Sequence, residues 1–348
     1  MQNFDEWGEI GAGLSVWEKG EEVLGLAGGV TERGGSVAWK DDTLMPIYSA
    51  GKGVAAATLA MVMKEEGGDE EWEVRRIWPE FAGGGKGALT LREVLSHQAG
   101  IAALDEQVDI ADHGACVGAI EKQTPNWRLG QGLHGYHART FGTVLEELVR
   151  RMCGGRTLGE MWRTLAGEPM GIDVWFGVPD SEMGRIGRLS GPREMLEEEF
   201  TRAYLDRNSL TRRAFESPGG FQRIEAMNGI EGWELGNAAM GGVASAGGLA
   251  KFYGLLASGA LCPSGVELMR RGVVAGDDLV LREKTAFSFG MMMRPAGVGS
   301  FGHPGAGGSL GLCDLSKSLG FGYVMNQMAA GALPGGRPTA LAHAVFAN

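Results

Sequence analysis

The sequence predicts an α+β fold in which strands from both ends of the chain form one antiparallel sheet, with a helical region inserted between them. Strand-like segments with tight turns occupy residues 10–48 and 287–326, and helix-like segments fill most of the interval. Strands and helices do not alternate along the chain, so the pattern does not favour βαβ units. We expect an α/β sheet domain at residues 1–70 and 235–348 and a mainly helical domain at residues 70–235.

The first strands are expected to form a hairpin, which is followed by an apolar helix. Alternating segments at residues 13–17 and 22–27 flank a polar turn, and residues 44–48 form a short extended approach to Ser49. Strong helix formers then continue to the glycine pair at residues 67–68, which ends the helix. Because about a dozen consecutive residues of this run are almost wholly apolar, we expect the helix to be buried nearly all round.

The middle of the chain predicts several helices joined by polar or glycine-rich loops. Thr90 followed by Glu93 forms a capping-box pattern at the start of one helix. Residues 130–136 are expected to form a loop, and residues 193–215 are expected to form a charged, helical and exposed excursion. The other expected helices span residues 72–81, 91–97, 108–122, 138–153, 158–166 and 246–258.

The C-terminal section returns to strands that are separated by tight turns. One turn is expected at residues 315–318, and a final helix is expected at residues 338–346. These strands complete the sheet that the N-terminal hairpin begins. They are expected at residues 287–294, 299–303, 306–314 and 320–326.

Composition restricts the classes of partner and the compartment. The 348 residues carry a formal net charge of −11, which argues against nucleic acid or an anionic membrane surface as a partner. No run of 18 apolar residues predicts a transmembrane helix. The acidic N-terminus lacks the apolar core of a secretory signal, so we expect a cytoplasmic protein. The four cysteines are widely spaced, and we expect reduced, buried thiols.

Ser49 and Lys52 are the first candidates for catalysis. Residues three apart share one face of a helix, so the lysine amine can reach the serine hydroxyl. A serine hydroxyl is a poor nucleophile unless a base takes its proton, and a lysine serves as that base only when burial or nearby cations favour its neutral form. The helix N-terminus also supplies N–H groups for a developing oxyanion. The alternative interpretation is that Ser49 is a helix cap and Lys52 is a solvated residue.

Three other patterns are interpreted as decoys. Residues 307–311 match Gly-x-Ser-x-Gly, but a strand follows the serine where a nucleophile elbow needs a helix. Residues 83–87 resemble a phosphate loop only superficially. His134 and His137 lie three apart in a loop without a carboxylate or cysteine cluster, so we expect neither a metal site nor any other cofactor.

Several segments, in order along the chain, resemble the serine β-lactamases and penicillin-binding proteins. The Ser49–Lys52 pair resembles their Ser-x-x-Lys motif. Tyr136 stands where their second motif places a tyrosine before a helix, and His303-Pro304-Gly305 resembles their third motif on a strand. The similarity is greatest to the class C-like branch and, within it, to the family VIII carboxylesterases. The resembling segments are residues 49–52, 78–81, 89–101, 135–142, 301–309 and 320–326.

The resemblance implies a role for each of these residues. Ser49 is the expected acylated nucleophile, and Lys52 and Tyr136 are expected to share the acid and base work, with Lys52 holding Tyr136 near its phenolate state. The N–H groups of Ser49 and Ala306 are the expected oxyanion hole. His303 is expected to line the cleft opposite Ser49, and Gly305 belongs to the same substrate-binding motif.

Two departures from the family pattern bear on the substrate. Ala138 stands where lactamases carry an asparagine that donates to the substrate amide, and it has no donor. Pro304 stands in place of a threonine that helps to grip the β-lactam carboxylate, and it has neither a hydroxyl nor an N–H. Both changes remove polar contacts and leave the acyl-transfer residues in place. We therefore expect a neutral or apolar ester as the substrate.

The resemblance and these departures together predict a serine hydrolase of the β-lactamase and DD-peptidase fold. The expected reaction is cleavage of small-molecule carboxylic esters with small or medium acyl chains through an acyl-enzyme on Ser49. Alternatives are a β-lactamase or DD-peptidase-like amide hydrolase, or an acyltransferase on the same scaffold. A non-catalytic binding protein is a further alternative, and the presence of Ser49, Lys52 and Tyr136 together argues against it.

Overall fold

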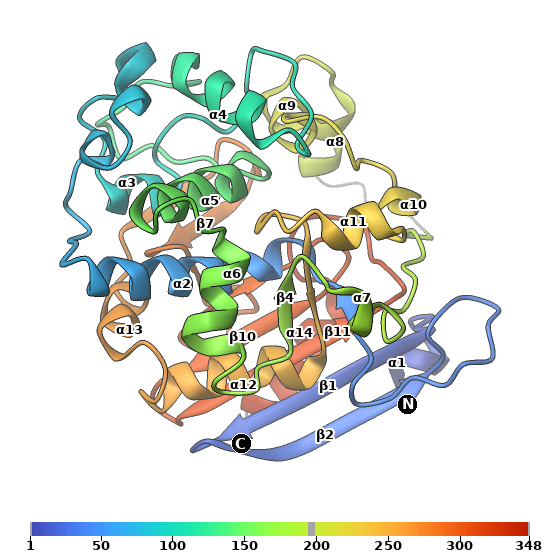
Figure 1. The fold of residues 1–348 in the computed structure, drawn as a ribbon. Coiled ribbons are helices and arrows are strands. Elements are labelled where there is room, and N and C mark those ends of the chain that lie inside the picture. Colours follow the sequence, from blue (N-terminus) through green and yellow to red (C-terminus); the bar gives the residue numbers. More distant parts are fainter. Residues whose placement is uncertain (1, 194–198, 347–348) are drawn as a thin grey trace.

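One eight-stranded antiparallel sheet unites the two ends of the chain (Figure 1). The computed structural model describes residues 2–193 and 199–346. The strand order is β2-β1-β11-β10-β9-β8-β7-β6, and β1 pairs with β11 so that Leu14 lies opposite Tyr323. This sheet, flanked by helices, confirms the predicted fold class. The strands are β1 Gly11–Glu18, β2 Glu21–Gly29, β6 Val274–Asp277, β7 Lys284–Phe287, β8 Met292–Met293, β9 Phe301–Pro304, β10 Leu310–Asp314 and β11 Leu319–Met325.

Helices cover the sheet, and many of those from the middle of the chain gather above α2 in the view of Figure 1. A second, three-stranded sheet has the order β3-β5-β4 and consists of Met45–Pro46, Gly242–Ala244 and Val174–Phe176. The helices are α1 Gln2–Asp5, α2 Gly51–Glu65, α3 Leu91–Leu95, α4 His113–Lys122, α5 Thr140–Met152, α6 Leu158–Trp162, α7 Asp180–Met183, α8 Glu199–Leu205, α9 Leu210–Glu216, α10 Ile224–Met227, α11 Ile230–Glu234, α12 Ala246–Ala257, α13 Pro263–Arg270 and α14 Gly336–Phe346.

Glycines on β11 allow α12 to lie directly against the sheet. Because side chains alternate along a strand, Gly320 faces α12 while Phe321 faces the opposite side. A Cβ added to Gly320 would lie 2.0 Å from the backbone nitrogen of Gly254 in α12, so no larger residue fits there. On the opposite face Phe321 packs against Phe346 of α14. The sheet therefore carries a helix on each side.

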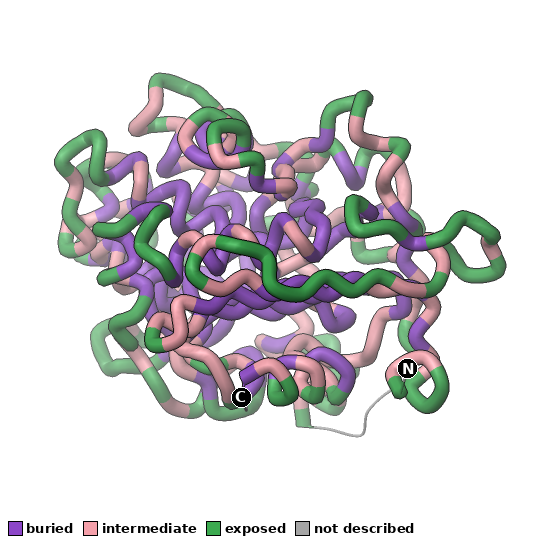
Figure 2. Tube along the Cα trace, turned by 90° about the horizontal axis from the view of Figure 1, so that it is seen from below, coloured by how far each residue is buried: buried purple, intermediate pink, exposed green. Residues whose placement is uncertain are grey.

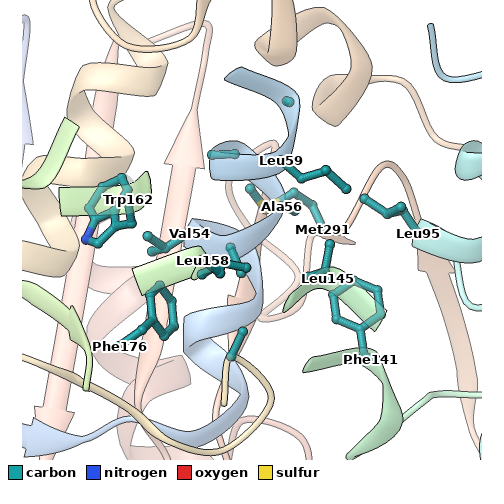
Figure 3. Close-up of a cluster of buried hydrophobic side chains, with 14 of the residues drawn as sticks. Val54, Ala56, Leu59, Leu95, Phe141, Leu145, Leu158, Trp162, Phe176 and Met291 are labelled. Atoms are coloured by element: carbon teal, nitrogen blue, oxygen red, sulfur yellow. The ribbon is translucent and has the colours of Figure 1, made fainter. Parts of the chain in front are cut away.

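The helix α2 runs through the centre of the molecule and is buried on almost every side, as the sequence predicts. Figure 3 shows Val54, Ala56 and Leu59 of this helix surrounded by side chains from other elements, including Phe141 of α5 and Trp162 of α6. A helix enclosed in this way cannot shift without disrupting the core. It therefore holds the residues at its N-terminal end in fixed positions.

The outermost strand, β2, is exposed over almost its whole length, whereas its neighbour β1 is largely buried (Figure 2). The hairpin of β1 and β2 matches the predicted one, with its turn between Glu18 and Glu21. No helix in the described part of the chain is long and apolar enough to span a bilayer. Three of the cysteines are buried and Cys153 is partly buried, and all four are free thiols.

The prediction of one helix at residues 72–81 is wrong. This stretch forms two short 3-10 turns, Val74–Arg76 and Pro79–Gly85. Pro79 has no N–H to donate to a preceding turn, and its ring disfavours helical geometry at Trp78, whose backbone is non-helical. The proline therefore divides a segment whose apolar pattern alone indicates one helix.

Two other predicted elements differ at their boundaries. The helix predicted at residues 108–122 begins only at His113, because the Asp112 side chain caps it by accepting the N–H of Ala115. The strand predicted at residues 287–294 is divided between β7 and β8 by a turn that contains Gly290 at a φ of +71°.

The remaining predictions agree with the described elements to within a few residues at most boundaries. The capping box at Thr90 and Glu93 is present, and the last helix is α14. The short strands β4, β5 and β6 and the helix α13 were not predicted from the sequence. Residues 194–198 of the predicted excursion lie outside the described residues, as do residues 1 and 347–348 of the predicted sheet domain.

Candidate active site

Ser49 lies in a 3-10 turn, Tyr48–Ala50, immediately before α2. The N-cap of α2 is Ala50, so Ser49 lies one residue before the cap, in agreement with its expected place near the start of the helix. The chain turns sharply here, with Tyr48 at a φ of +47°. The buried hydroxyl of Ser309 donates a hydrogen bond of 2.8 Å to the carbonyl of Ile47. The serine of the Gly-x-Ser-x-Gly pattern therefore holds the turn that presents Ser49.

Lys52 contacts Ser49 as the sequence predicts. Its Nζ lies 2.8 Å from the Ser49 Oγ, 2.9 Å from the carbonyl oxygen of Ala138 and 3.3 Å from that of Ala239. The Lys52 side chain is completely buried, so it is not a solvated helix residue. Burial, and secondly the nearby cation of Arg139, hold the pKa of the Lys52 amine well below its usual range. The neutral amine, which can accept the serine proton, is thereby favoured.

Tyr136 completes this group from the loop that precedes α5. The Lys52 Nζ lies 4.8 Å from the centre of the Tyr136 ring. The Tyr136 hydroxyl interacts with the Ser49 side chain. Burial raises the pKa of the Tyr136 phenol above its usual value, and the contact with Ser49 offsets this only in part. This direction favours the protonated phenol in the free site, and the expected phenolate state of Tyr136 stays a prediction.

A buried carboxylate that sequence reasoning missed holds the loop of Tyr136. The Asp278 Oδ1 accepts the backbone N–H groups of Tyr136 at 3.1 Å and of Val280 and Leu281 at 2.8 Å. Its Oδ2 accepts the hydroxyl of Thr285 at 3.0 Å. The carboxyl group of Asp278 thus accepts four hydrogen bonds in this region. Asp278 therefore ties the tyrosine loop to the segment between β6 and β7.

His303 does not lie where the resemblance implies. It is buried on β9 behind Tyr136, with 5.9 Å between the two ring centres, and it does not line the cavity beside Ser49. Its Nδ1 lies 2.8 Å from the carbonyl oxygen of Pro304. Burial, and secondly the charge of Lys52, lower the pKa of His303 to about 3. A neutral imidazole at this position packs against Tyr136, and the prediction that it lines the cleft is wrong.

Gly305 and Ala306 follow β9 at the edge of the cavity. A Cβ on Gly305 would lie 2.0 Å from the carbonyl oxygen of Ile47, so this glycine allows the strand end to approach the turn that carries Ser49. Ala306 lines the cavity together with Ser49. In the described residues, neither the Ser49 N–H nor the Ala306 N–H donates to a backbone turn or to a side chain. Both donors are consistent with the predicted oxyanion hole.

A cavity of about 400 Å³ opens beside Ser49. Much of its wall comes from the segment around α8 and α9, so the predicted excursion is not simply an exposed appendage. Phe215 contacts both Phe200 and Tyr136, with ring centres 5.3 Å and 6.4 Å apart. Aromatic residues within a strongly charged segment were the sequence signal for this wall. The wall residues from this part of the chain are Pro192, Phe200, Thr201, Tyr204, Phe215, Phe221, Gln222 and Ile224.

The other histidines near the site have separate partners. The His134 Nε2 lies 2.8 Å from the Thr285 hydroxyl, whereas the His137 Nδ1 lies 2.8 Å from the carbonyl oxygen of Gly135. The His137 Nε2 accepts the N–H of Ile101 at 3.0 Å, which requires a neutral ring. No group of three or more His, Cys, Asp or Glu residues in residues 2–193 and 199–346 is arranged to hold a metal ion.

Comparisons with known proteins agree with this arrangement. A family model described as Beta-lactamase matches residues 2–346. The protein called Esterase/beta-lactamase LipL, from Mycobacterium tuberculosis, is 29% identical over 337 residues, which cover 91% of this chain and 77% of that protein.

Solved structures with the same fold match almost the entire chain. A penicillin-binding protein homolog from Caulobacter crescentus has a TM-score of 0.90 and 31% identity, covering 99% of this chain and 94% of its own. A family VIII carboxylesterase has a TM-score of 0.88 and 30% identity, with the same coverage of 99% and 94%. EstA from Arthrobacter nitroguajacolicus Rue61a has a TM-score of 0.85 and 28% identity, with coverage of 97% and 91%. The family match over residues 2–346 shows that the chain belongs to the beta-lactamase family, and its sheet and the contact between Ser49 and Lys52 agree with this.

Proposed function

We propose that this protein is a serine hydrolase that cleaves carboxylic esters of small or medium acyl chains through an acyl-enzyme on Ser49. The observation that carries the proposal is the contact of 2.8 Å between the Ser49 Oγ and the buried Lys52 Nζ, beside the Tyr136 hydroxyl and the cavity. The similarity to a family VIII carboxylesterase and to EstA supports an ester as the substrate.

In the acylation step, the Ser49 Oγ attacks the ester carbonyl carbon while the neutral Lys52 amine takes the serine proton. The negative charge on the carbonyl oxygen is stabilised by the N–H groups of Ser49 and Ala306. The bond to the alcohol oxygen then breaks, and Tyr136 gives its proton to this oxygen. The new ammonium of Lys52 returns a proton to Tyr136, which leaves Lys52 neutral, the alcohol free and the acyl group on Ser49.

Hydrolysis of the acyl-enzyme follows the same path with water. Lys52 takes a proton from the water as its oxygen attacks the acyl carbon, and the tetrahedral intermediate again rests against the N–H groups of Ser49 and Ala306. When the bond to Ser49 breaks, the serine oxygen recovers a proton through Tyr136 and Lys52. One ester and one water thus yield one acid and one alcohol. An acyltransferase would follow the same scheme with an alcohol in place of the water.

The second candidate function is β-lactam hydrolysis, which the name of the Mycobacterium tuberculosis relative includes. Ala138 and Pro304 count against it, since neither residue supplies the side-chain donors that the family pattern uses for the amide and carboxylate of a lactam. We therefore expect turnover of p-nitrophenyl acetate, butyrate and octanoate to exceed turnover of nitrocefin. Nitrocefin turnover that exceeds ester turnover would favour the second candidate.

The nucleophile can be tested by labelling. An alkyl fluorophosphonate should modify the protein once, and peptide mapping should place the adduct on Ser49 and not on the buried Ser309. Ser49→Ala should abolish both the adduct and the ester turnover. As a control, replacement of the exposed Ser316 by alanine should change neither. Ester turnover that survives in Ser49→Ala would overturn the assignment.

A further inference from the structure

Arg139 introduces a positive charge into the wall of the cavity beside Ser49. The residue follows Ala138, immediately before α5, and lines the same cavity as Ser49. Its side chain is buried, with only 6% of the residue exposed. The remaining wall is largely aromatic or small and apolar, so this guanidinium is the feature that departs most from the neutral site that the sequence predicts.

The guanidinium is incompletely paired. Its Nη2 donates to the carbonyl oxygens of Gly219, at 3.1 Å, and Gly220. Its buried Nε has no hydrogen-bond partner among the described residues, and within them no carboxylate lies within 4.0 Å of the guanidinium. The carboxylate of Asp109 attracts Arg139 from farther away, but one of its oxygens accepts the N–H of Ala111.

A buried cation without a carboxylate partner is energetically unfavourable unless a ligand completes its hydrogen bonds. Burial lowers the pKa of Arg139 to about 10, which leaves the guanidinium charged at neutral pH. Its charge also disfavours a positive charge on Lys52, which contacts Ser49. Because Nη2 already donates to two carbonyl oxygens, the Nη1 N–H groups are the donors available to a carboxylate, which they can bind through a charge-assisted hydrogen bond.

We propose that Arg139 is a subsite for a carboxylate of the substrate, so that the enzyme prefers esters that carry a second, free carboxylate. The proposal rests on the proposed function of Ser49, because the ester group must lie at Ser49 while the carboxylate lies at Arg139. The apolar wall between them accommodates the hydrocarbon part of the substrate. The carboxylate can belong to the acyl part, as in a dicarboxylic half-ester, or to the alcohol part, as in an acylated hydroxy acid.

Matched substrate pairs test this proposal on the wild-type protein. The first pairs are the monomethyl and dimethyl esters of succinate, adipate and suberate, which place the carboxylate on the acyl part. The second pair is 6-acetoxyhexanoate and its methyl ester, which places it on the alcohol part. Rates are followed by acid release at pH 7.5 and constant ionic strength. We expect kcat/KM for the charged member of at least one pair to exceed that of the neutral member about tenfold, the effect of one charged hydrogen-bonding contact.

Two variants connect this preference to Arg139. Arg139→Met should reduce the ratio of charged to neutral kcat/KM about tenfold, whereas Arg139→Lys, which keeps the charge, should retain part of it. Arg270→Met is the matched control, because it removes one charge from an exposed side chain on α13 and should leave the ratio unchanged. Circular dichroism and thermal unfolding identify a variant that fails to fold. If Arg139→Met does not fold, the ratios of charged to neutral kcat/KM in the wild type and in Arg139→Lys test the proposal.

The outcomes separate this proposal from the proposed function. If the neutral esters are hydrolysed in a Ser49-dependent way but no charged member is preferred, the carboxylate subsite is wrong and the esterase remains. An unchanged preference in a folded Arg139→Met would also refute the subsite. If no ester is hydrolysed and the fluorophosphonate does not label Ser49, the function of Ser49 is wrong and the subsite proposal fails with it.

Discussion

Replacement of Lys52 by methionine tests whether the buried amine is neutral in the folded protein. Lys52 is completely buried and contacts three oxygens, and the salt bridges found among the described residues do not include it. Burial holds its pKa well below the usual value. The unfolded chain, in contrast, exposes this lysine to water, where its pKa is about 10.4.

This difference makes the stability of the wild type depend on pH. Between the folded and unfolded pKa values, the unfolded state binds one proton that the folded state does not bind, so the free energy of unfolding rises with pH. The slope is about 1.4 kcal/mol per pH unit and declines toward pH 10.4. For an amine that is neutral in the folded protein at pH 8, the contribution of Lys52 from pH 8 to pH 10 is about 2.5 kcal/mol. Lys52→Met lacks this contribution. The variant also loses the hydrogen bonds of Lys52 to the carbonyl oxygens of Ala138 and Ala239, which lowers its stability by the same amount at every pH.

The assay is urea unfolding of both proteins at pH 8, 9 and 10. The free energy of unfolding of the wild type, minus that of Lys52→Met, should increase by about 2.5 kcal/mol over this range. Lys64→Met, which replaces an exposed lysine near the end of the same helix, should follow the wild type at each pH. Parallel curves for the wild type and Lys52→Met would show that the amine is protonated in the folded protein, and the assignment of Lys52 as base would be refuted.

Three further substitutions probe Tyr136, its support and the sheet. Tyr136→Phe should lower kcat/KM for an ethyl ester by about 10²- to 10³-fold. The loss should be much smaller for a p-nitrophenyl ester, because its leaving group needs no proton. Equal losses for the two esters would contradict the role of Tyr136 as acid. Asp278→Asn should lower the free energy of unfolding by about 1.5–3 kcal/mol in urea, because it weakens charge-assisted hydrogen bonds, and an unchanged value would contradict this. Gly320→Ala should cost at least about 1–3 kcal/mol through its clash with Gly254, whereas Gly247→Ala, with open space around it, should be tolerated.

The sequence was sufficient where the information is local. Ser49 and Lys52 are three residues apart, so their contact follows from the geometry of one turn. The burial of α2 follows from its continuous apolar run, and the presence of strands at both ends of the chain follows from their local alternation and turns. The role of Tyr136 required the family resemblance, because a single tyrosine before a helix indicates nothing specific. The division into domains at residues 70 and 235 stays a prediction.

The information that the sequence does not carry lies in contacts between distant segments. Asp278 is 142 residues from Tyr136, and no local pattern indicates that its carboxylate accepts the Tyr136 N–H. The direction in which His303 points depends on how β9 meets the loop of Tyr136, which only the assembled sheet fixes. Arg139 was visible within the second motif, but its contacts with the carbonyl oxygens of residues 219–220, and the absence of a carboxylate beside it among the described residues, depend on the assembled fold.

In the proposed mechanism, the burial of Lys52 and Tyr136 explains how one pair acts as both base and acid. In the free site, burial lowers the pKa of the amine and raises the pKa of the phenol, which favours the neutral form of each group. Uptake of the Ser49 proton creates an ammonium 4.8 Å from the centre of the tyrosine ring, and this charge lowers the cost of forming a phenolate. The phenol therefore becomes a stronger acid at the stage of the reaction when the departing alcohol needs a proton. The charge of Arg139 also lowers the pKa of Lys52 and so favours the neutral amine in the free site.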